Sequence, residues 1–142
     1  MEKILIVEDH TDLRKLLALA LRKYNRSFFH TNNGQEALDI ARRERPDVIL
    51  LDAKLAGAMD GYETARRLRS QPETKNLPIL FLSTGVLRSD RARAFAAGAD
   101  TYIEKPFKLA FLKEQIEDLI QGQTSASEEQ PSFRVAEDPP RE

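Results

Sequence analysis

Short apolar runs alternate along the chain with longer segments in which apolar residues recur every three or four positions. Short runs rich in β-branched residues are typical of buried strands, and the longer period is typical of helices that pack on a sheet. The alternation repeats five times. It predicts an α/β fold, a doubly wound five-stranded parallel sheet with five helices distributed on both faces.

The expected strands cover residues 3–7, 27–31, 48–51, 79–82 and 101–104. The second is the weakest of them, because it is short and contains His30. Thr11 and Asp60 are expected to cap the first and third helices, and Gly98 is expected to end the fourth. The helices are expected at about 11–24, 35–45, 61–70, 90–98 and 108–120.

The composition changes near the end of the last expected helix. Residues 1–121 have the length and apolar content of one domain, whereas residues 122–142 are rich in Ser, Glu and Pro and lack periodicity. We therefore predict a single domain at 1–121, followed by a disordered acidic tail or the stub of a linker. The alternative is that the tail folds on a partner through Phe133 and Val135.

Charge and composition exclude several classes of function. The chain has 22 basic and 23 acidic residues, so no overall field would draw it to nucleic acid or to an anionic membrane. It contains no Cys, which excludes thiolate zinc sites and catalytic cysteine. No secretion signal and no membrane-length apolar run occurs. We expect a cytoplasmic protein without direct contact to nucleic acid or membrane.

Polar and charged side chains lie at the ends of the expected strands. The first strand ends in Glu8 and Asp9, the third in Asp52, the fourth in Ser83 and the fifth in Lys105. The carboxyl ends of parallel strands meet at one edge of the sheet, so we expect these groups to converge. Clustered acids require a cation between them, and oxygen donors alone favour Mg²⁺.

An aspartate beside Mg²⁺ and a lysine can act as a nucleophile that accepts a phosphoryl group. In this hypothesis Asp52 is the acceptor, Lys105 neutralises the phosphoryl oxygens, and Ser83 donates a hydrogen bond to one of them. Two structural alternatives stay open: Asp52 can cap the segment that follows it, and Ser83 can be an ordinary buried hydroxyl.

The chain resembles response-regulator receiver domains from residue 3 to about residue 120. The resemblance is carried, in this order, by the segments ILIVEDH, NGQEAL, PDVILLD, LPILFLST and GADTYIEKPF. It implies the flavodoxin-like strand order 2-1-3-4-5. It also implies a phosphorylation-switched signalling module, which promotes only its own phosphorylation and dephosphorylation and is not otherwise an enzyme.

The resemblance assigns roles to individual residues. Glu8, Asp9, Asp52 and the backbone carbonyl of Lys54 would hold Mg²⁺, and Asp52 would accept phosphate from a histidine kinase or a phosphotransfer protein. Lys105 would be the partner of the phosphate.

The resemblance also implies how the signal leaves the domain. Ser83 and Tyr102 would switch on phosphorylation. Output would pass to an unknown downstream protein through the fourth helix, the fifth strand and the last helix. The protein would be a monomer or a phosphorylation-dependent dimer.

Two departures from the family pattern bear on this interpretation. Ala56 stands in the loop after Asp52, where family members usually have proline, and Thr84 replaces a smaller residue. Lys54 and Gly85 lie where access and phosphate lifetime are tuned. These departures keep open the alternative of a degenerate receiver that acts as a phosphorylation-independent scaffold. An aspartyl phosphatase is disfavoured, because Lys54 stands where such enzymes carry their general acid.

Overall fold

The computed structural model describes residues 1–85 and 87–122, in which strands and helices alternate from the first residues to the last. Most of the predicted tail, residues 123–142, lies outside this part. The elements in chain order are β1 (Glu2–Val7), α1 (Thr11–Ala20), β2 (Arg26–Thr31), α2 (Gly34–Glu44), β3 (Val48–Asp52), α3 (Gly61–Ser70), β4 (Ile79–Ser83), α4 (Asp90–Ala97), β5 (Thr101–Glu104) and α5 (Leu109–Ile120).

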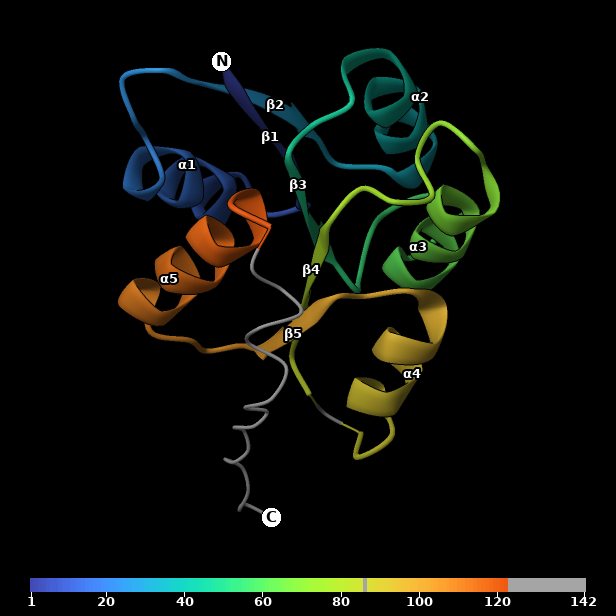
Figure 1. Ribbon diagram of the computed structural model, residues 1–142. Helices are drawn as coiled ribbons and strands as arrows, with labels where there is room; N and C mark the ends of the chain where they lie inside the picture. Colours follow the sequence, from blue (N-terminus) through green and yellow to red (C-terminus); the bar gives the residue numbers. More distant parts are fainter. Residues whose placement is uncertain (86, 123–142) are drawn as a thin grey trace.

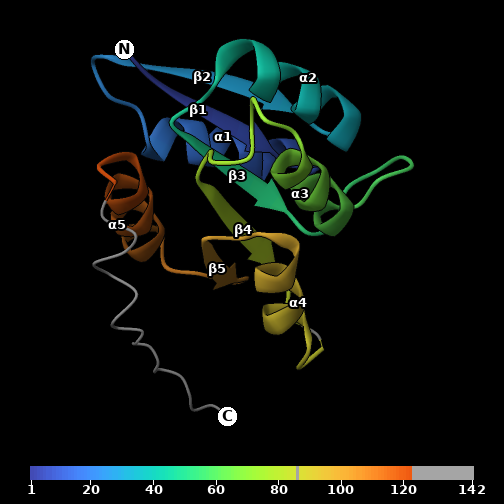
Figure 2. The ribbon, with the colours of Figure 1, turned by 45° about the vertical axis from the view of Figure 1, so that its right-hand side comes forward.

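The five strands form one parallel sheet in the order β2-β1-β3-β4-β5. Helices α1 and α5 cover one face of this sheet, and α2, α3 and α4 cover the other (Figures 1 and 2). The predicted fold class and strand order are therefore confirmed. Each crossover returns the chain to the same end of the sheet, so all the strands point toward one edge.

Strand β3 shows why its sequence is apolar without interruption. Val48 and Leu50 pack in the cluster under α1 and α5, whereas Ile49 and Leu51 pack in the cluster under α2, α3 and α4. Successive side chains of a strand point to opposite faces, and here both faces are covered. All five residues of β3 are buried, including the terminal Asp52.

Side-chain caps begin two of the helices. Asn33 accepts a hydrogen bond from the backbone N–H of Glu36 at 2.8 Å, and Asp60 accepts one from that of Glu63 at 2.9 Å. The prediction for Asp60 is confirmed. The prediction for Thr11 is wrong: Thr11 is the first residue of α1, and no side chain caps this helix.

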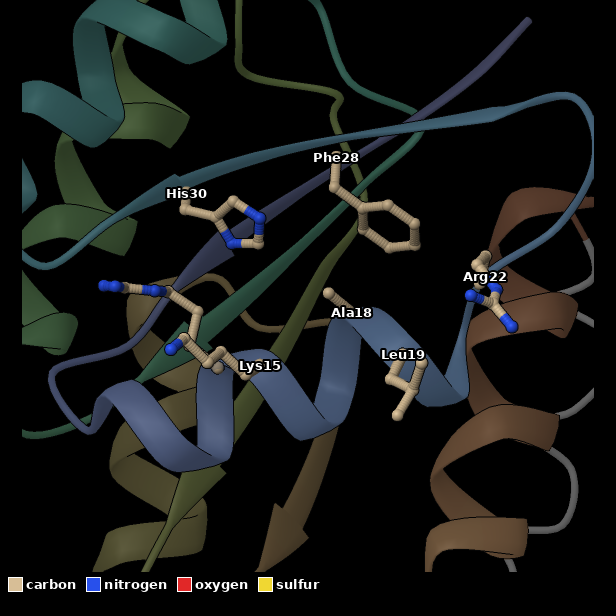
Figure 3. Close-up of a pocket in the computed structure, with 7 residues that line it drawn as sticks. Lys15, Ala18, Leu19, Arg22, Phe28 and His30 are labelled. Atoms are coloured by element: carbon tan, nitrogen blue, oxygen red, sulfur yellow. The ribbon is translucent and has the colours of Figure 1, made fainter.

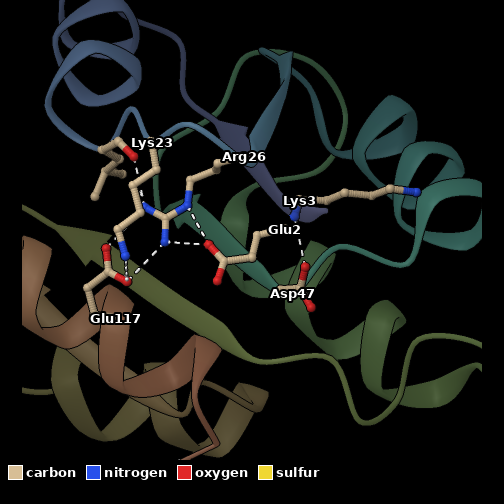
Figure 4. A network of polar contacts seen from close by, with 7 residues as sticks. Glu2, Lys3, Lys23, Arg26, Asp47 and Glu117 are labelled. Carbon is tan, nitrogen blue, oxygen red and sulfur yellow. Dashed lines mark hydrogen bonds and ion pairs between the residues drawn. The ribbon is translucent and has the colours of Figure 1, made fainter.

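The starting ends of the strands carry a buried ion-pair network (Figure 4). The Arg26 guanidinium, whose side chain is fully buried, lies 2.7 Å from Glu2 and 2.9 Å from Glu117. It also donates to the Leu21 carbonyl at 2.8 Å, and Lys23 pairs with Glu117 at 3.2 Å. One side chain thus joins β1, β2 and α5 to the turn that follows α1.

Candidate functional site

The strand ends bring together the charged groups that the sequence places after them. Glu8 follows β1, Asp52 ends β3, and Lys105 follows β5. Lys105 Nζ lies 2.9 Å from Asp52 Oδ1 and 3.4 Å from Glu8 Oε1. The predicted convergence is therefore found for these three residues, although 97 positions separate Glu8 from Lys105.

Burial makes this arrangement electrostatically demanding. The side chain of Glu8 is 1% exposed and that of Asp52 is 3% exposed, so both carboxylates lie largely out of water. They share a single ammonium, that of Lys105, which leaves an excess of negative charge among the three. Buried charge without full compensation is costly, and an added cation would relieve it.

The pKa of Asp52 records this cost. Burial, opposed by the hydrogen bond from Lys105 and reinforced by the negative charge of Glu8, raises the pKa of Asp52 from 3.8 to about 6. Removal from water disfavours the ionised form of a carboxylic acid. The pKa of Asp52 therefore lies closer to neutral pH than that of an ordinary aspartate, as the pKa values of functional carboxylates often do.

Asp9 and His10 complete the segment after β1. Asp9 is partly buried and forms no ion pair with the other described residues. The backbone N–H of His10 donates to Glu8 Oε2 at 3.1 Å, and its ring Nδ1 lies 3.0 Å from the same oxygen. The sequence does not indicate this contact, because the alternation along a strand does not show how the chain turns beyond the end of the strand.

The oxygen donors present suit Mg²⁺ better than a softer metal. No group of three His, Asp or Glu side chains that could enclose a metal ion occurs in the described residues. Mg²⁺ rarely needs such a cage, since it keeps several waters and takes one or two carboxylates together with phosphate oxygens. The excess negative charge of Glu8 and Asp52 fits a divalent cation of this kind.

Ser83 lies at the end of β4, one residue beyond the position that pairs with Asp52 in the sheet. Its side chain is buried, and its hydroxyl accepts a hydrogen bond from the backbone N–H of Gly85 at 3.1 Å. Tyr102 lies on the neighbouring strand β5. Its hydroxyl is buried without a hydrogen-bond partner in the described structure, and burial raises its pKa, an effect that the nearby Ser83 opposes.

A second aromatic group, absent from the sequence prediction, lies beside Ser83. The Tyr62 hydroxyl donates to Asp90 Oδ1 at 3.4 Å, and the Arg93 guanidinium lies 3.9 Å from the centre of the Tyr62 ring. Asp90 also accepts from the backbone N–H of Leu87 at 3.0 Å. These contacts join α3 to the start of α4, and no local sequence pattern indicated them.

The remaining predicted positions lie on the rim. Lys54 and Thr84 are exposed. Gly85 has a φ of 67°, a backbone conformation that disfavours any residue with a Cβ, whereas the nearby side chain of Glu104 is exposed and can move aside. The loop of residues 53–60, which contains Ala56, extends away from the sheet (Figure 2).

The family described as "Response regulator receiver domain" matches residues 4–117 of the chain. Phosphorylation-dependent signalling is the general role of this family, whose members are modules of two-component systems. Within the described residues, no helix combines the length and hydropathy that a membrane span requires.

The curated relatives include transcriptional regulators from bacteria. The transcriptional regulatory protein YxdJ of Bacillus subtilis is 42% identical over 120 residues, which cover 82% of this chain and 51% of the relative. The phosphate regulon transcriptional regulatory protein PhoB of Rhizobium meliloti is 38% identical over 84% of this chain and 52% of its own length. The chain thus spans about half the length of these relatives.

Solved structures agree with the fold. A response regulator structure from Chloroflexus aurantiacus is 33% identical, with a TM-score of 0.78, and the match covers 84% of this chain and 98% of that one. A receiver domain from Pseudomonas aeruginosa PAO1, solved with a magnesium ion in its active-site cleft, is 32% identical, with a TM-score of 0.76 and the same coverage. On sequence and structure together, the chain belongs to the response regulator receiver domain family.

Proposed function

We propose that Asp52 accepts a phosphoryl group from a histidine kinase or a phosphotransfer protein, and that the modified domain signals by protein contact. The contact of one ammonium, Lys105, with both Asp52 and Glu8 is the observation that carries this proposal. It brings a nucleophile, a cation for the phosphoryl oxygens and a second carboxylate into one cluster.

The transfer needs little from the protein beyond position and charge. An Asp52 oxygen attacks the phosphorus of a phosphohistidine, the new O–P bond forms as the P–N bond breaks, and the donor imidazole leaves with the electron pair and takes up a proton. Asp52 must be ionised to attack, and its pKa of about 6 leaves it so near neutral pH. Lys105 then pairs with the phosphoryl oxygens of the acyl phosphate.

The carboxylates of Glu8, Asp9 and Asp52 and the backbone carbonyl of Lys54 would hold Mg²⁺. When bound, the ion neutralises charge on the transferring phosphoryl group. Glu8 is held in place from the other side by the backbone N–H of His10. This contact orients a carboxylate that the ion pair with Lys105 alone would leave free to turn.

The switch would run from Ser83 to the α4, β5 and α5 surface. Ser83 would donate to a phosphoryl oxygen, and Tyr102, whose hydroxyl lacks a partner, would follow it inward. This surface exposes three large apolar side chains that a downstream protein can cover: Leu87, Phe95 and Phe111. Thr84, Gly85 and Lys54 at the rim would tune access and phosphate lifetime.

The proposal places the chain in the cytoplasm, as a monomer or a phosphorylation-dependent dimer that contacts neither membrane nor nucleic acid through residues 1–142. The transcriptional regulators that the chain matches are about twice as long as the matched part, and the proposal concerns only residues 1–142.

The test is to incubate the protein with Mg²⁺ and a small acyl phosphodonor and then to measure its intact mass. The expected result is a gain of one phosphoryl group, which peptide mapping places on Asp52. Asp52→Asn should show no gain, and the matched control Asp12→Asn, at an exposed acid of α1, should behave as the wild type.

A wild-type protein that gains no mass would contradict the proposal and would favour the degenerate receiver that acts as a scaffold. An adduct that persists in Asp52→Asn would place the modification elsewhere and would contradict the proposal as well.

A further inference from the structure

A groove lies between α1 and the edge strand β2 (Figure 3). Its volume is about 500 Å³. The apolar lining consists of Ala18 and Leu19 from the helix and Phe28 from the strand, and Leu19 is 60% exposed. Glu8, Asp52 and Lys105 do not line it, so the groove is separate from the proposed phosphorylation site.

The polar lining of the groove is basic. Arg14, Lys15 and Arg22 contribute three cations, and none of them forms an ion pair or side-chain hydrogen bond within the described residues. His30, the remaining lining residue, has its pKa lowered by burial and by the charge of Arg14. An apolar floor edged by uncompensated positive charge is complementary to an acidic segment that carries apolar side chains.

The chain contains one segment of this composition. Residues 123–142 hold five acids and two bases, and Phe133 and Val135 lie between the acidic pairs Glu128-Glu129 and Glu137-Asp138. Side chains two residues apart lie on the same side of an extended chain, so Phe133 and Val135 can enter a groove together.

The segment also starts near the groove. It follows α5. Glu117 of this helix pairs with Arg26 and with Lys23, and Lys23 is the residue directly after the groove residue Arg22. Figure 3 shows Arg22 at the end of α1 that faces α5. Phe133 lies eleven positions after Gly122, a distance that can span roughly 36–40 Å when extended. The ten residues of α1 span about 15 Å, so the segment reaches any point of the groove.

We propose that residues 128–138 of this chain bind in the groove between α1 and β2. Phe133 and Val135 pack against Leu19 and Phe28, and the flanking acids pair with the cations of α1. The bound segment covers the outer face of α1, so an acidic partner that uses this face must displace it. The proposal does not depend on phosphorylation of Asp52.

Paramagnetic relaxation enhancement in the full chain tests this contact. Because the chain contains no Cys, Ala136→Cys provides a single attachment site for a nitroxide spin label. We expect the amide signals of Ala18, Leu19 and Phe28 to lose more than half their intensity relative to the reduced label. The signal of Lys75, which lies in the loop between α3 and β4, should keep its intensity.

Variants of the groove separate a specific contact from random encounters. The triple change Arg14→Glu, Lys15→Glu and Arg22→Glu should restore the lost signals, as should about 1 M NaCl, at which the screening length is about 3 Å. The matched charge reversal Lys75→Glu should not restore them. Leu19→Ser, at an exposed position, should weaken the contact without disturbing the fold.

Several outcomes would overturn the proposal. They are the absence of signal loss at the groove, equal loss over the whole surface, and loss that survives the triple charge reversal in a protein with an otherwise native spectrum. Signal loss that disappears on dilution would assign the groove to a second copy of the chain and would equally contradict binding within one molecule.

Discussion

The buried carboxylate of Asp52 should make the stability of the protein depend on pH. Its folded-state pKa, about 6, lies above its ordinary value of 3.8. The stability that neutral Asp52 provides is therefore present below about pH 4 and is lost as the pH rises through about 6. Asp52→Asn, which cannot ionise, should raise the free energy of unfolding at pH 8 by up to about 3 kcal/mol.

Urea unfolding at several pH values, in EDTA to remove divalent ions, measures this effect. The advantage of Asp52→Asn should shrink between pH 6 and pH 4, whereas Asp12→Asn, at an exposed acid, should follow the wild type at every pH. A variant that is equally or less stable than the wild type at pH 8 would show that Lys105 compensates the charge of Asp52 completely.

Lys105 should hold the pKa of Asp52 below the value that burial alone would give. Its hydrogen bond and its charge both lower this pKa, against the effects of burial and Glu8. Lys105→Met keeps much of the side-chain volume but removes the ammonium, so the Asp52 pKa should rise above about 6. Carboxyl carbon shifts in an NMR titration measure it directly. An unchanged midpoint would mean that the ion pair at 2.9 Å does not persist in solution.

At the level of elements, the Arg26 network should be a main tie between α5 and the sheet. Arg26→Ala removes a fully buried guanidinium and leaves Glu2 and Glu117 without their partner. Because both acids are partly exposed, we expect a loss of about 3 kcal/mol, the low end for a broken buried pair. Chemical denaturation measures the loss.

A surface pair provides the matched control for Arg26. Arg66→Ala breaks the exposed contact with Glu63 on α3 and should cost less than about 1 kcal/mol. Equal losses in the two variants would mean that burial adds nothing to the Arg26 network.

The same elements show what the sequence could and could not predict. The apolar run of β3 and its terminal Asp52 followed from periodicity, because a strand covered on both faces has no polar positions to interrupt it. The contact between Tyr62 and Asp90 did not follow. It depends on how α3 and α4 pack side by side, and a residue of either helix carries no local sign of its neighbour in the other.

The charged network at the strand starts illustrates the same limit. Arg26 lies one residue before the predicted second strand, and arginine is rarely buried unless it is paired. Its burial is possible because Glu117, 91 positions later, returns to meet it. Glu8, Asp52 and Lys105 were predicted correctly as a cluster, because the parallel topology alone brings strand ends to one edge.

Over the whole molecule, the two faces of the sheet carry different surfaces. The α1 and α5 face holds the basic groove at its edge, beside the exposed Leu19, whereas α4 on the other face exposes Phe95. The carboxylates of Glu8 and Asp52 lie at the strand ends between these layers. In the proposed function, phosphorylation of Asp52 would act on the α4, β5 and α5 surface through Ser83 and Tyr102 and would leave the groove as it is.

Binding of Mg²⁺ at the strand ends should stabilise the whole fold, because an ion that binds only the folded state shifts the unfolding equilibrium. At a concentration one hundred times its Kd, the free energy of unfolding should rise by about 2.7 kcal/mol. Thermal or urea unfolding with and without Mg²⁺ measures the rise. It should largely vanish in Asp9→Asn and Asp52→Asn and persist in Asp12→Asn. An equal rise in all four proteins would place the ion elsewhere, and no rise in the wild type would contradict the proposed site.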